Sequence, residues 1–296
     1  MQTLKLISIY CHVCDKYNKV LYEHVQRFST NQLQGQITDE EILTIYLFCT
    51  AYEQKQTVKS MYEHIKHYWL SWFPTLPSYQ AFNERLNRLS TAFPVLVEAL
   101  CEEFNLEADT LAVLLGDSMP IVTCAGSRKG KVAKQLTDKG YCATKKMHYY
   151  EVKLHVMGLR RSGSLPLPKV ALATPASVHD LTALRPLLET LRVPAVLDKA
   201  YCDTTLAEKV ITNGATLITP IKAQKGKPEA LKLFDTSYEQ LFNTAVSKVR
   251  QPIEALFSWF EEKTKIQKAS KVRSEKGLIV HIFGKLAACM LLLAGF

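Results

Sequence analysis

The hydrophobic pattern of this 296-residue chain changes near residue 108, and this change restricts the folds that the chain can adopt. Before it, apolar residues recur at helical spacing, as in the stretch from Ile42 to Cys49. After it, β-rich runs separated by polar or glycine-containing segments cover residues 111–125, 148–161 and 167–177. We therefore predict a helical region over residues 1–108 and an α/β domain over residues 109–296.

The second region continues with elements of both kinds. Helices are predicted at 181–191 and 204–214, strands at 194–200 and 215–221, and two further helices after a basic loop. An antiparallel meander followed by alternating helices and strands describes a mixed sheet with helices on its faces. Asp180 and Asp203 are each placed to cap the helix that follows, which makes both weaker candidates for metal ligation.

Capping residues mark the helices of the first region. Thr38 and Glu41 form a capping box before one helix, and Ser78 is placed to cap another. The outward face of the helix after Ser78 carries side chains that can bond to bases or phosphates: Gln80, Asn83, Asn87 and Arg88. With the preceding helix it predicts either a helix-turn-helix or an ordinary helical bundle, and the sequence does not decide between them.

Three carboxylates stand far apart in the chain within apolar runs: Asp117, Asp198 and Glu254. A charged carboxylate in apolar surroundings is costly unless it has a partner, most often a cation. The predicted elements place Asp117 on the first strand, Asp198 at the end of the fourth and Glu254 on a helix against the sheet. If the three converge, they form a cage of oxygen ligands that suits Mg²⁺ and phosphodiester chemistry.

Cations accompany the third carboxylate. At 100° per residue, one side of a helix from Arg250 to about Lys265 carries Arg250, Glu254, Glu261 and Lys265. No GxSxG elbow and no phosphate-cradling glycine loop occurs in the sequence. Hydrolases that use a serine nucleophile and nucleotide kinases therefore have little support.

The formal net charge of +9 at pH 7 favours a polyanion as the partner. Such a composition also occurs in membrane-surface proteins and in proteins that are merely soluble. We assign DNA contacts to basic residues of predicted loops and to one on the third helix: Arg128, Lys129, Lys131, Lys145, Lys146 and Arg88. A solvated surface is the simpler explanation of any single cluster.

The ends of the chain carry two further signals. No export signal is evident at the N-terminus, so we expect a cytoplasmic protein. The apolar stretch Leu278–Phe296 contains His281 and Lys285 and is at the short limit for a membrane span, which favours a buried terminal helix. Cys11 and Cys14 form a CxxC without a second ligand pair at zinc spacing, which favours two small core residues over a metal site.

Three motifs resemble those of DDE transposases of bacterial insertion sequences, most closely the insertion sequence 982 family. They are GDSMPI around Asp117, LDKAYCD around Asp198 and RQPIEALFSWFEE around Glu254. Order and context agree over most of residues 109–290, and SYQAFNERLNRL at 78–89 is also similar. The separations between successive acids suit a core without a large inserted domain.

The resemblance implies a ribonuclease H-like core in which Asp117, Asp198 and Glu254 hold two Mg²⁺ ions, with Mn²⁺ as a substitute. It implies metal-dependent cleavage of DNA at transposon ends and strand transfer into target DNA. The partners would be the terminal inverted repeats and the target, bound by a homodimer or a higher oligomer, with no membrane involved. The helical region would bind DNA, and the protein would be associated with the bacterial nucleoid.

Accessory positions agree only in part with the resemblance. Tyr201 and Arg250 match residues of the family pattern, whereas Ser247 and Glu261 stand where related enzymes often have tyrosine and lysine. Lys265, one turn further along, is our candidate to replace the lysine in contacting DNA. Two alternatives stay open: a metal-dependent nuclease that does not join DNA, and a catalytically decayed DNA-binding repressor.

Overall fold

The structure is a computed structural model that describes residues 2–25, 37–104, 112–127, 132–142, 146–222 and 229–296. The chain forms two compact units. The helical unit comprises Met1–Glu103, Ile121–Glu151 and Phe260–Phe296, and the sheet unit comprises Phe104–Pro120 and Val152–Trp259. The predicted boundary at residue 108 falls outside the described residues, so the division into a DNA-binding region and a catalytic domain stays a prediction.

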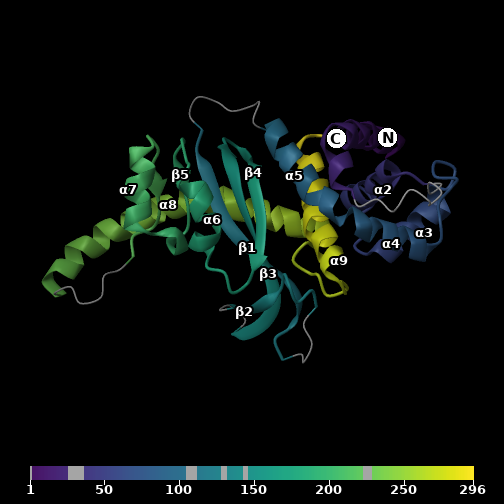
Figure 1. The fold of residues 1–296 in the computed structure, drawn as a ribbon. Helices are drawn as coiled ribbons and strands as arrows, with labels where there is room; N and C mark the ends of the chain where they lie inside the picture. Colours follow the sequence, from purple (N-terminus) through teal and green to yellow (C-terminus); the bar gives the residue numbers. More distant parts are fainter. Residues whose placement is uncertain (1, 26–36, 105–111, 128–131, 143–145, 223–228) are drawn as a thin grey trace. The chain divides into compact units, whose positions relative to one another are not determined.

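The helices and strands are numbered in chain order, and Figure 1 labels most of them. The α-helices are α1 (Gln2–Lys16), α2 (Asp39–Ala51), α3 (Val58–Tyr68), α4 (Tyr79–Arg88), α5 (Ala92–Glu103), α6 (Asp180–Leu188), α7 (Thr204–Thr212), α8 (Glu229–Thr264), α9 (Glu275–Ile279) and α10 (Lys285–Leu293). The strands are β1 (Leu114–Ala125), β2 (Asp138–Cys142), β3 (Met147–Arg161), β4 (Ser164–Pro175), β5 (Ala195–Val196) and β6 (Leu217–Ile218). Short 3-10 or π segments are Tyr17–Leu21, Tyr22–His24, Leu89–Thr91, Lys199–Tyr201 and Val280–Gly284.

Helix α2 lies at the centre of the helical unit. Every residue from Ile42 to Ala51 is buried, because α1, α3, α4 and α10 all contact this helix. The helix begins with the predicted capping box: Glu41 N–H donates to Thr38 Oγ1 at 3.2 Å, and Thr38 N–H donates to Glu41 Oε2 at 2.7 Å. Ser78 likewise accepts from Ala81 N–H at 3.4 Å and caps α4.

The apolar C-terminal stretch packs into the same unit. Helix α10 contacts α2 and α5, and its residues from Lys285 to Leu291 are buried. Residues Glu275–Leu293 are long and apolar enough to cross a membrane, but 67% of the most apolar window is buried inside the structure. The packing is close at Gly284, where a Cβ atom would lie 2.5 Å from Cε1 of Tyr46. The stretch is therefore a core helix here, as predicted.

The sheet has the strand order β2-β3-β1-β5-β6, and β4 also pairs with β3. Strands β3 and β4 are antiparallel, whereas β1, β5 and β6 run parallel to one another. Leucines of α6 and α7 pack into one core with β5, and in Figure 1 α6 lies in front of the strands and α8 behind them. This is the predicted mixed sheet flanked by helices, with a helical region before it in the chain.

The structure departs from the sequence predictions at several places. Strand β2 was not predicted, because DKGYC lacks the apolar alternation of a strand. Asp203 caps α7 as expected, accepting from Leu206 N–H at 2.8 Å. The prediction that Asp180 is a cap was wrong: His179 caps α6, and the Asp180 carboxylate accepts from Lys153 Nζ at 3.0 Å.

Two further differences concern the helical unit. Helices α3 and α4 are joined by residues 69–78, a connection much longer than the three or four residues of a helix-turn-helix. Of the two alternatives for this region, the structure shows a helical bundle. Cys11 is exposed rather than part of the core, because it lies on the outer side of α1, and Cys14 is half-buried.

Lys285 is an unusual member of the core of the helical unit. Its side chain is 2% exposed, and Nζ donates to Gln56 Oε1 and to the Lys265 carbonyl, both at 3.3 Å. Burial lowers the pKa of Lys285 to about 8, with nearby Glu261 acting in the opposite direction. The charged form is therefore destabilised by its surroundings.

Replacing Lys285 with Met is expected to stabilise the chain at neutral pH. Below about pH 8, Lys285 is protonated in both the folded and the unfolded chain, and the folded chain is destabilised by the buried charge. Between about pH 8 and 10.5, Lys285 is deprotonated in the folded chain but still protonated in the unfolded chain, so the stability of the wild type rises with pH. We expect Lys285→Met to raise the free energy of unfolding by about 1–3 kcal/mol at pH 7, and this gain to shrink as pH rises through that window.

Urea unfolding of both proteins at several pH values measures this difference. Lys66→Met is the matched control, because Lys66 is exposed on α3. A gain for Lys285→Met that grows between pH 8 and 10.5 would contradict the prediction.

Candidate active site

The three carboxylates are carried by three elements of the sheet unit. Asp117 lies on β1, which pairs in parallel with β5 through Leu114↔Ala195 and Leu115↔Val196. Asp198 follows two residues after β5 and begins the 3-10 segment Lys199–Tyr201. Glu254 lies on α8, one helical turn after Arg250. Continued along this parallel register, Asp117 and Asp198 are level with each other, each three residues after the pair Leu114↔Ala195.

The side chain of Arg250 joins the three acids. Its guanidinium donates from Nη2 to Asp117 Oδ2 at 2.8 Å and from Nη1 to Asp198 Oδ1 at 3.0 Å. Its Nη2 also lies 3.7 Å from Oε1 of Glu254. The structure therefore brings Asp117, Asp198 and Glu254 together around one cationic group.

The three acids differ in burial. The Arg250 side chain is 8% exposed, whereas those of Asp117, Asp198 and Glu254 are 23%, 42% and 57% exposed. Asp117 is thus enclosed, while the other two reach solvent. The apolar sequence around Asp198 and Glu254 reflects the packing of their neighbours rather than a dry setting for the carboxylates.

Burial dominates the electrostatics of Asp117. It raises the pKa of this carboxyl, although the Ser118 N–H, which donates to Oδ1 at 2.8 Å, and Arg250 act in the opposite direction; the nearby Asp198 adds to the rise. Gly116, just before Asp117, is closely packed: a Cβ there would lie 2.5 Å from Cδ2 of Leu197. The backbone of β1 thus lies directly against the residue that precedes Asp198.

Tyr201 lies fully buried next to this site. Burial raises the pKa of its hydroxyl, and the charges of Asp180, Asp117 and Asp198 raise it further. Within the described parts of the chain, the hydroxyl has no hydrogen-bond partner. Tyr201 also packs with Leu184 and Leu206, so it belongs to the core that supports the second aspartate.

We predicted that Lys265 lies on the same helix face as Arg250 and Glu254, and this prediction was wrong. Helix α8 ends at Thr264, and Lys265 has φ of 51°, a left-handed conformation that terminates a helix. Glu261 is engaged locally, because its Oε2 accepts the Gln267 N–H at 2.9 Å. The structure shows no contact of Lys265 with the three acids among the residues it describes, and its role in DNA contact stays a prediction.

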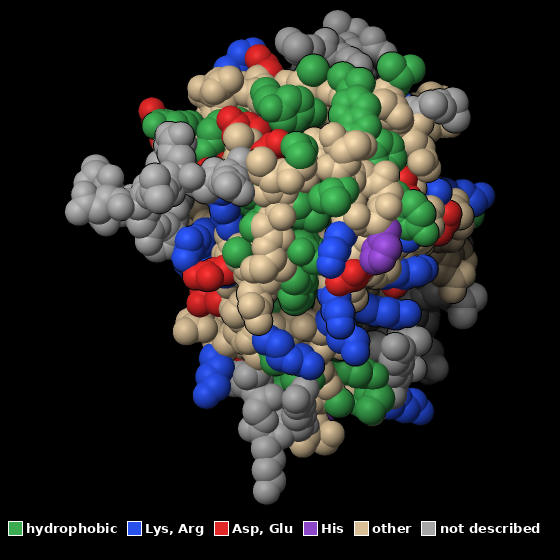
Figure 2. Space-filling model, turned by 90° about the vertical axis from the view of Figure 1, so that its right-hand side faces the viewer, with side chains coloured by type: hydrophobic (Ala, Val, Ile, Leu, Met, Phe, Trp, Pro, Cys, Tyr) green, Lys and Arg blue, Asp and Glu red, His purple; other side chains and the backbone are tan. Residues whose placement is uncertain are grey.

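The predicted DNA-contacting residues are only partly described. Arg128, Lys129, Lys131 and Lys145 lie outside the described residues. Lys146 is exposed at the start of β3, and Arg88 pairs with Glu84 on α4. Figure 2 shows Lys and Arg side chains gathered over the lower part of one face of the molecule, in keeping with the net charge of +9.

The donor atoms at the triad suit a divalent ion. Carboxylate oxygens are the ligands that Mg²⁺ prefers, and oxygens of all three acids already converge on a positive charge. Among the described residues, no group of three acidic, His or Cys side chains lies close enough to hold a metal ion as it stands. The three acids fit the ion chemically, but in this structure the guanidinium of Arg250 contacts their oxygens.

A family comparison decides the class of the chain. Residues 111–292 match the family model described as the transposase DDE domain, and these residues include all three acids. The chain belongs to this DDE transposase family. No curated protein sequence matches the chain.

Two solved structures that contain Mos1 transposase were also found. The chain is 10% identical to a chain of the Mos1 transposase paired-end complex with left transposon end, covering 82% of this chain and 85% of that one at a TM-score of 0.21. It is 12% identical to a chain of a pre-cleavage Mos1 transpososome, covering 95% and 86% at a TM-score of 0.23. Likeness at this level carries no argument about the present transposase.

Replacing Arg250 with Met is expected to destabilise the transposase and to make its stability respond to Mg²⁺. Loss of the shared cation leaves the enclosed Asp117 with the Ser118 N–H but without a positive charge beside it, which should cost about 1–3 kcal/mol at pH 7. The freed oxygens should then bind Mg²⁺, so the ion should stabilise the variant more than the wild type.

Urea unfolding with and without millimolar Mg²⁺ provides the measurement. Arg185→Met is the matched control, because Arg185 pairs with Glu189 and Asp203 away from the triad. Equal Mg²⁺ responses of the two variants would show that Arg250 does not compete with the ion.

Proposed function

We propose that this chain is a DNA transposase that cuts DNA at transposon ends and joins those ends to a target. In this proposal Asp117, Asp198 and Glu254 bind two Mg²⁺ ions, for which Mn²⁺ can substitute. The observation that carries the proposal is the convergence of three acids, from β1, from the end of β5 and from α8, on one guanidinium. Membership of the DDE transposase family supports the same conclusion.

The reaction has two steps of the same kind. In the first, water attacks the phosphorus at a transposon end, and the bond from phosphorus to the 3′ oxygen breaks and releases a 3′-hydroxyl. In the second, this hydroxyl attacks a phosphorus of the target strand and displaces that strand's 3′ oxygen. Asp117, Asp198 and Glu254 would hold the metal ions, which would supply activation of the attacking oxygen and stabilisation of the leaving one.

The residues around the triad have separate tasks in this proposal. Arg250 balances the acids' negative charge until the ions bind, and it then becomes available for a DNA phosphate. Tyr201 positions Asp198 from beneath, through packing rather than by contact with DNA. The exposed sides of Asp198 and Glu254 face solvent, where a substrate strand can approach.

The partners follow from this chemistry. We propose that the chain binds its own terminal inverted repeats and a target duplex, as a dimer or a higher oligomer, in the cytoplasm and next to the nucleoid. Basic side chains outside the triad, including Lys146, supply sequence-independent phosphate contacts.

Replacing Asp117 or Asp198 with Asn, or Glu254 with Gln, is expected to lower Mg²⁺-dependent cleavage of a terminal-repeat duplex by more than about a hundredfold. The amides keep the shape of the acids but lose the charge that holds the ions. DNA binding should stay within about twofold, because the acids do not contact phosphate directly. Cleavage is measured on labelled DNA by denaturing electrophoresis, and binding by fluorescence anisotropy.

Asp203→Asn is the matched control. It changes an acid near Asp198 that caps α7, so it should cost some stability but leave cleavage unchanged. Wild-type activity in any of the three triad variants would overturn the assignment. Cleavage without joined products would point to a nuclease, and binding without cleavage by the wild type would point to a repressor.

A further inference from the structure

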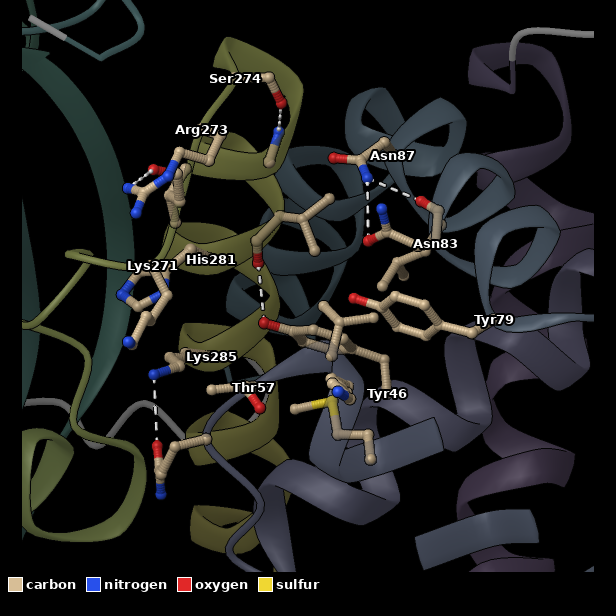
Figure 3. Close-up of a pocket in the computed structure, with 18 residues that line it drawn as sticks. Tyr46, Thr57, Tyr79, Asn83, Asn87, Lys271, Arg273, Ser274, His281 and Lys285 are labelled. Carbon is tan, nitrogen blue, oxygen red and sulfur yellow. Dashed lines mark hydrogen bonds between the residues drawn. The ribbon is translucent and has the colours of Figure 1, made fainter. Parts of the chain in front are cut away.

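A second polar site lies in the helical unit, built entirely from residues outside the triad. It is a pocket of about 500 Å³ between α2, α3 and α4 on one side and residues 271–285 on the other. Figure 3 shows Lys271, Arg273 and Lys285 on one side of it and Asn83, Asn87 and Tyr79 on the opposite side. A pocket of this volume is large enough for one nucleotide.

The charged side chains that line this pocket are all positive. Four cationic side chains line it, Lys59, Lys271, Arg273 and Lys285, and no carboxylate does among the residues described. Lys59, Lys271 and Arg273 are exposed, so the positive charge extends to solvent. His281 also lines it but stays neutral, because burial and then the charge of Lys285 lower its pKa to about 3; the contact of its Nε2 with the Ile266 carbonyl, at 2.7 Å, acts in the opposite direction.

Lys285 gives the second, independent observation. A buried cation is normally paired with a carboxylate, because an unpaired charge is costly in the interior. Here Nζ donates to the neutral oxygens of Gln56 and Lys265, and the carboxylate of Glu261 acts on it only through its charge. Among the described residues, no carboxylate forms a direct ion pair with this buried cation.

The wall opposite the cations suits a base. Asn87 Nδ2 donates to the Asn83 carbonyl at 2.6 Å, which leaves the Oδ1 of Asn87 and the Nδ2 of Asn83 for other partners. One amide donor and one amide acceptor match the edge of a nucleobase. The ring of Tyr79 and the apolar Met61 and Leu86 line the space next to them.

We propose that this pocket of the helical unit binds one unpaired nucleotide of a DNA strand. Its phosphate lies beside Lys271, Arg273 and Lys285, and its base edge lies against Asn83 and Asn87. The inference rests on the proposed function, which makes DNA the substrate. It adds a binding site that is separate in the chain from the three acids and that takes a strand in its single-stranded form.

The test compares single-stranded and duplex DNA on the full chain without metal. The probes are a fluorescein-labelled 12-nucleotide strand and a labelled duplex, and the measurement is fluorescence anisotropy at several salt concentrations. Lys285→Met should weaken binding of the strand about tenfold and that of the duplex by less than about twofold. Lys271→Gln and Arg273→Gln should each lower the salt slope for the strand by about 0.7.

Two controls separate the pocket from general charge and from folding. Lys66→Gln removes a charge from α3 outside the pocket and should leave strand binding and its salt slope unchanged. Lys285→Met should remain folded, as urea unfolding would show, so its loss of binding cannot come from loss of structure. Asn83→Ala should reduce discrimination among homopolymeric strands without changing the salt slope.

The outcomes distinguish this inference from the proposed function. Strand binding by Lys285→Met and Lys271→Gln equal to that of Lys66→Gln overturns the pocket but leaves the transposase proposal standing. Equal weakening for strand and duplex, or competition by inorganic phosphate as strong as by a deoxynucleoside monophosphate, also overturns it. Failure of the wild type to bind either DNA overturns both.

Discussion

The guanidinium of Arg250 contacts three carboxylates that come from three separate elements of the sheet unit. Three negative charges at this separation repel one another, and the repulsion is strongest at Asp117, which is the most enclosed. The planar guanidinium, with its several N–H donors, offsets this repulsion and orients the carboxylate groups. Because Arg250 and Glu254 lie one turn apart on α8, the same contacts fix which side of that helix faces β1 and β5. The geometry of the whole site depends on this one side chain.

Most of the sheet unit can be predicted from local pattern. Apolar runs around Asp117 and Asp198 indicate strands, and the alternation of helix and strand after residue 180 indicates parallel pairing. Local sequence pattern does not show which cation pairs with each acid. Arg250 is 133 residues from Asp117 and 52 from Asp198, so only the contact with Glu254 is visible as a helical spacing. Lys265 shows the reverse error, because helical spacing was extended one residue beyond the end of α8.

The helical unit shows why a polar helix face is hard to interpret from sequence. Periodicity correctly separates the buried Phe82 and Leu86 from the polar side of α4. It does not reveal that the C-terminal residues 271–285 lie across from Asn83 and Asn87, which turns an outward face into a pocket wall. Lys285 was visible only as a charge within an apolar run, which argued against a membrane span. In the structure, Lys285 is a buried cation that lines this pocket. The one sign of this in the sequence was that no acid stands three or four residues from Lys285, where it could pair with it on a helix.

The two buried cations Arg250 and Lys285 differ in the groups that pair with their charge. Arg250 is surrounded by acids of the chain itself, so its partners are complete before any substrate arrives. Among the described residues, the hydrogen-bond partners of Lys285 are neutral oxygens, which leaves its charge open to an anion from outside. A chain that carries three converging acids repels DNA at the place where DNA must react, and it needs attraction elsewhere to hold the strand. A cationic pocket built from residues other than those acids would supply such attraction without competing for the metal ions. Separate residues for holding a strand and for cutting it then allow each to be altered without loss of the other.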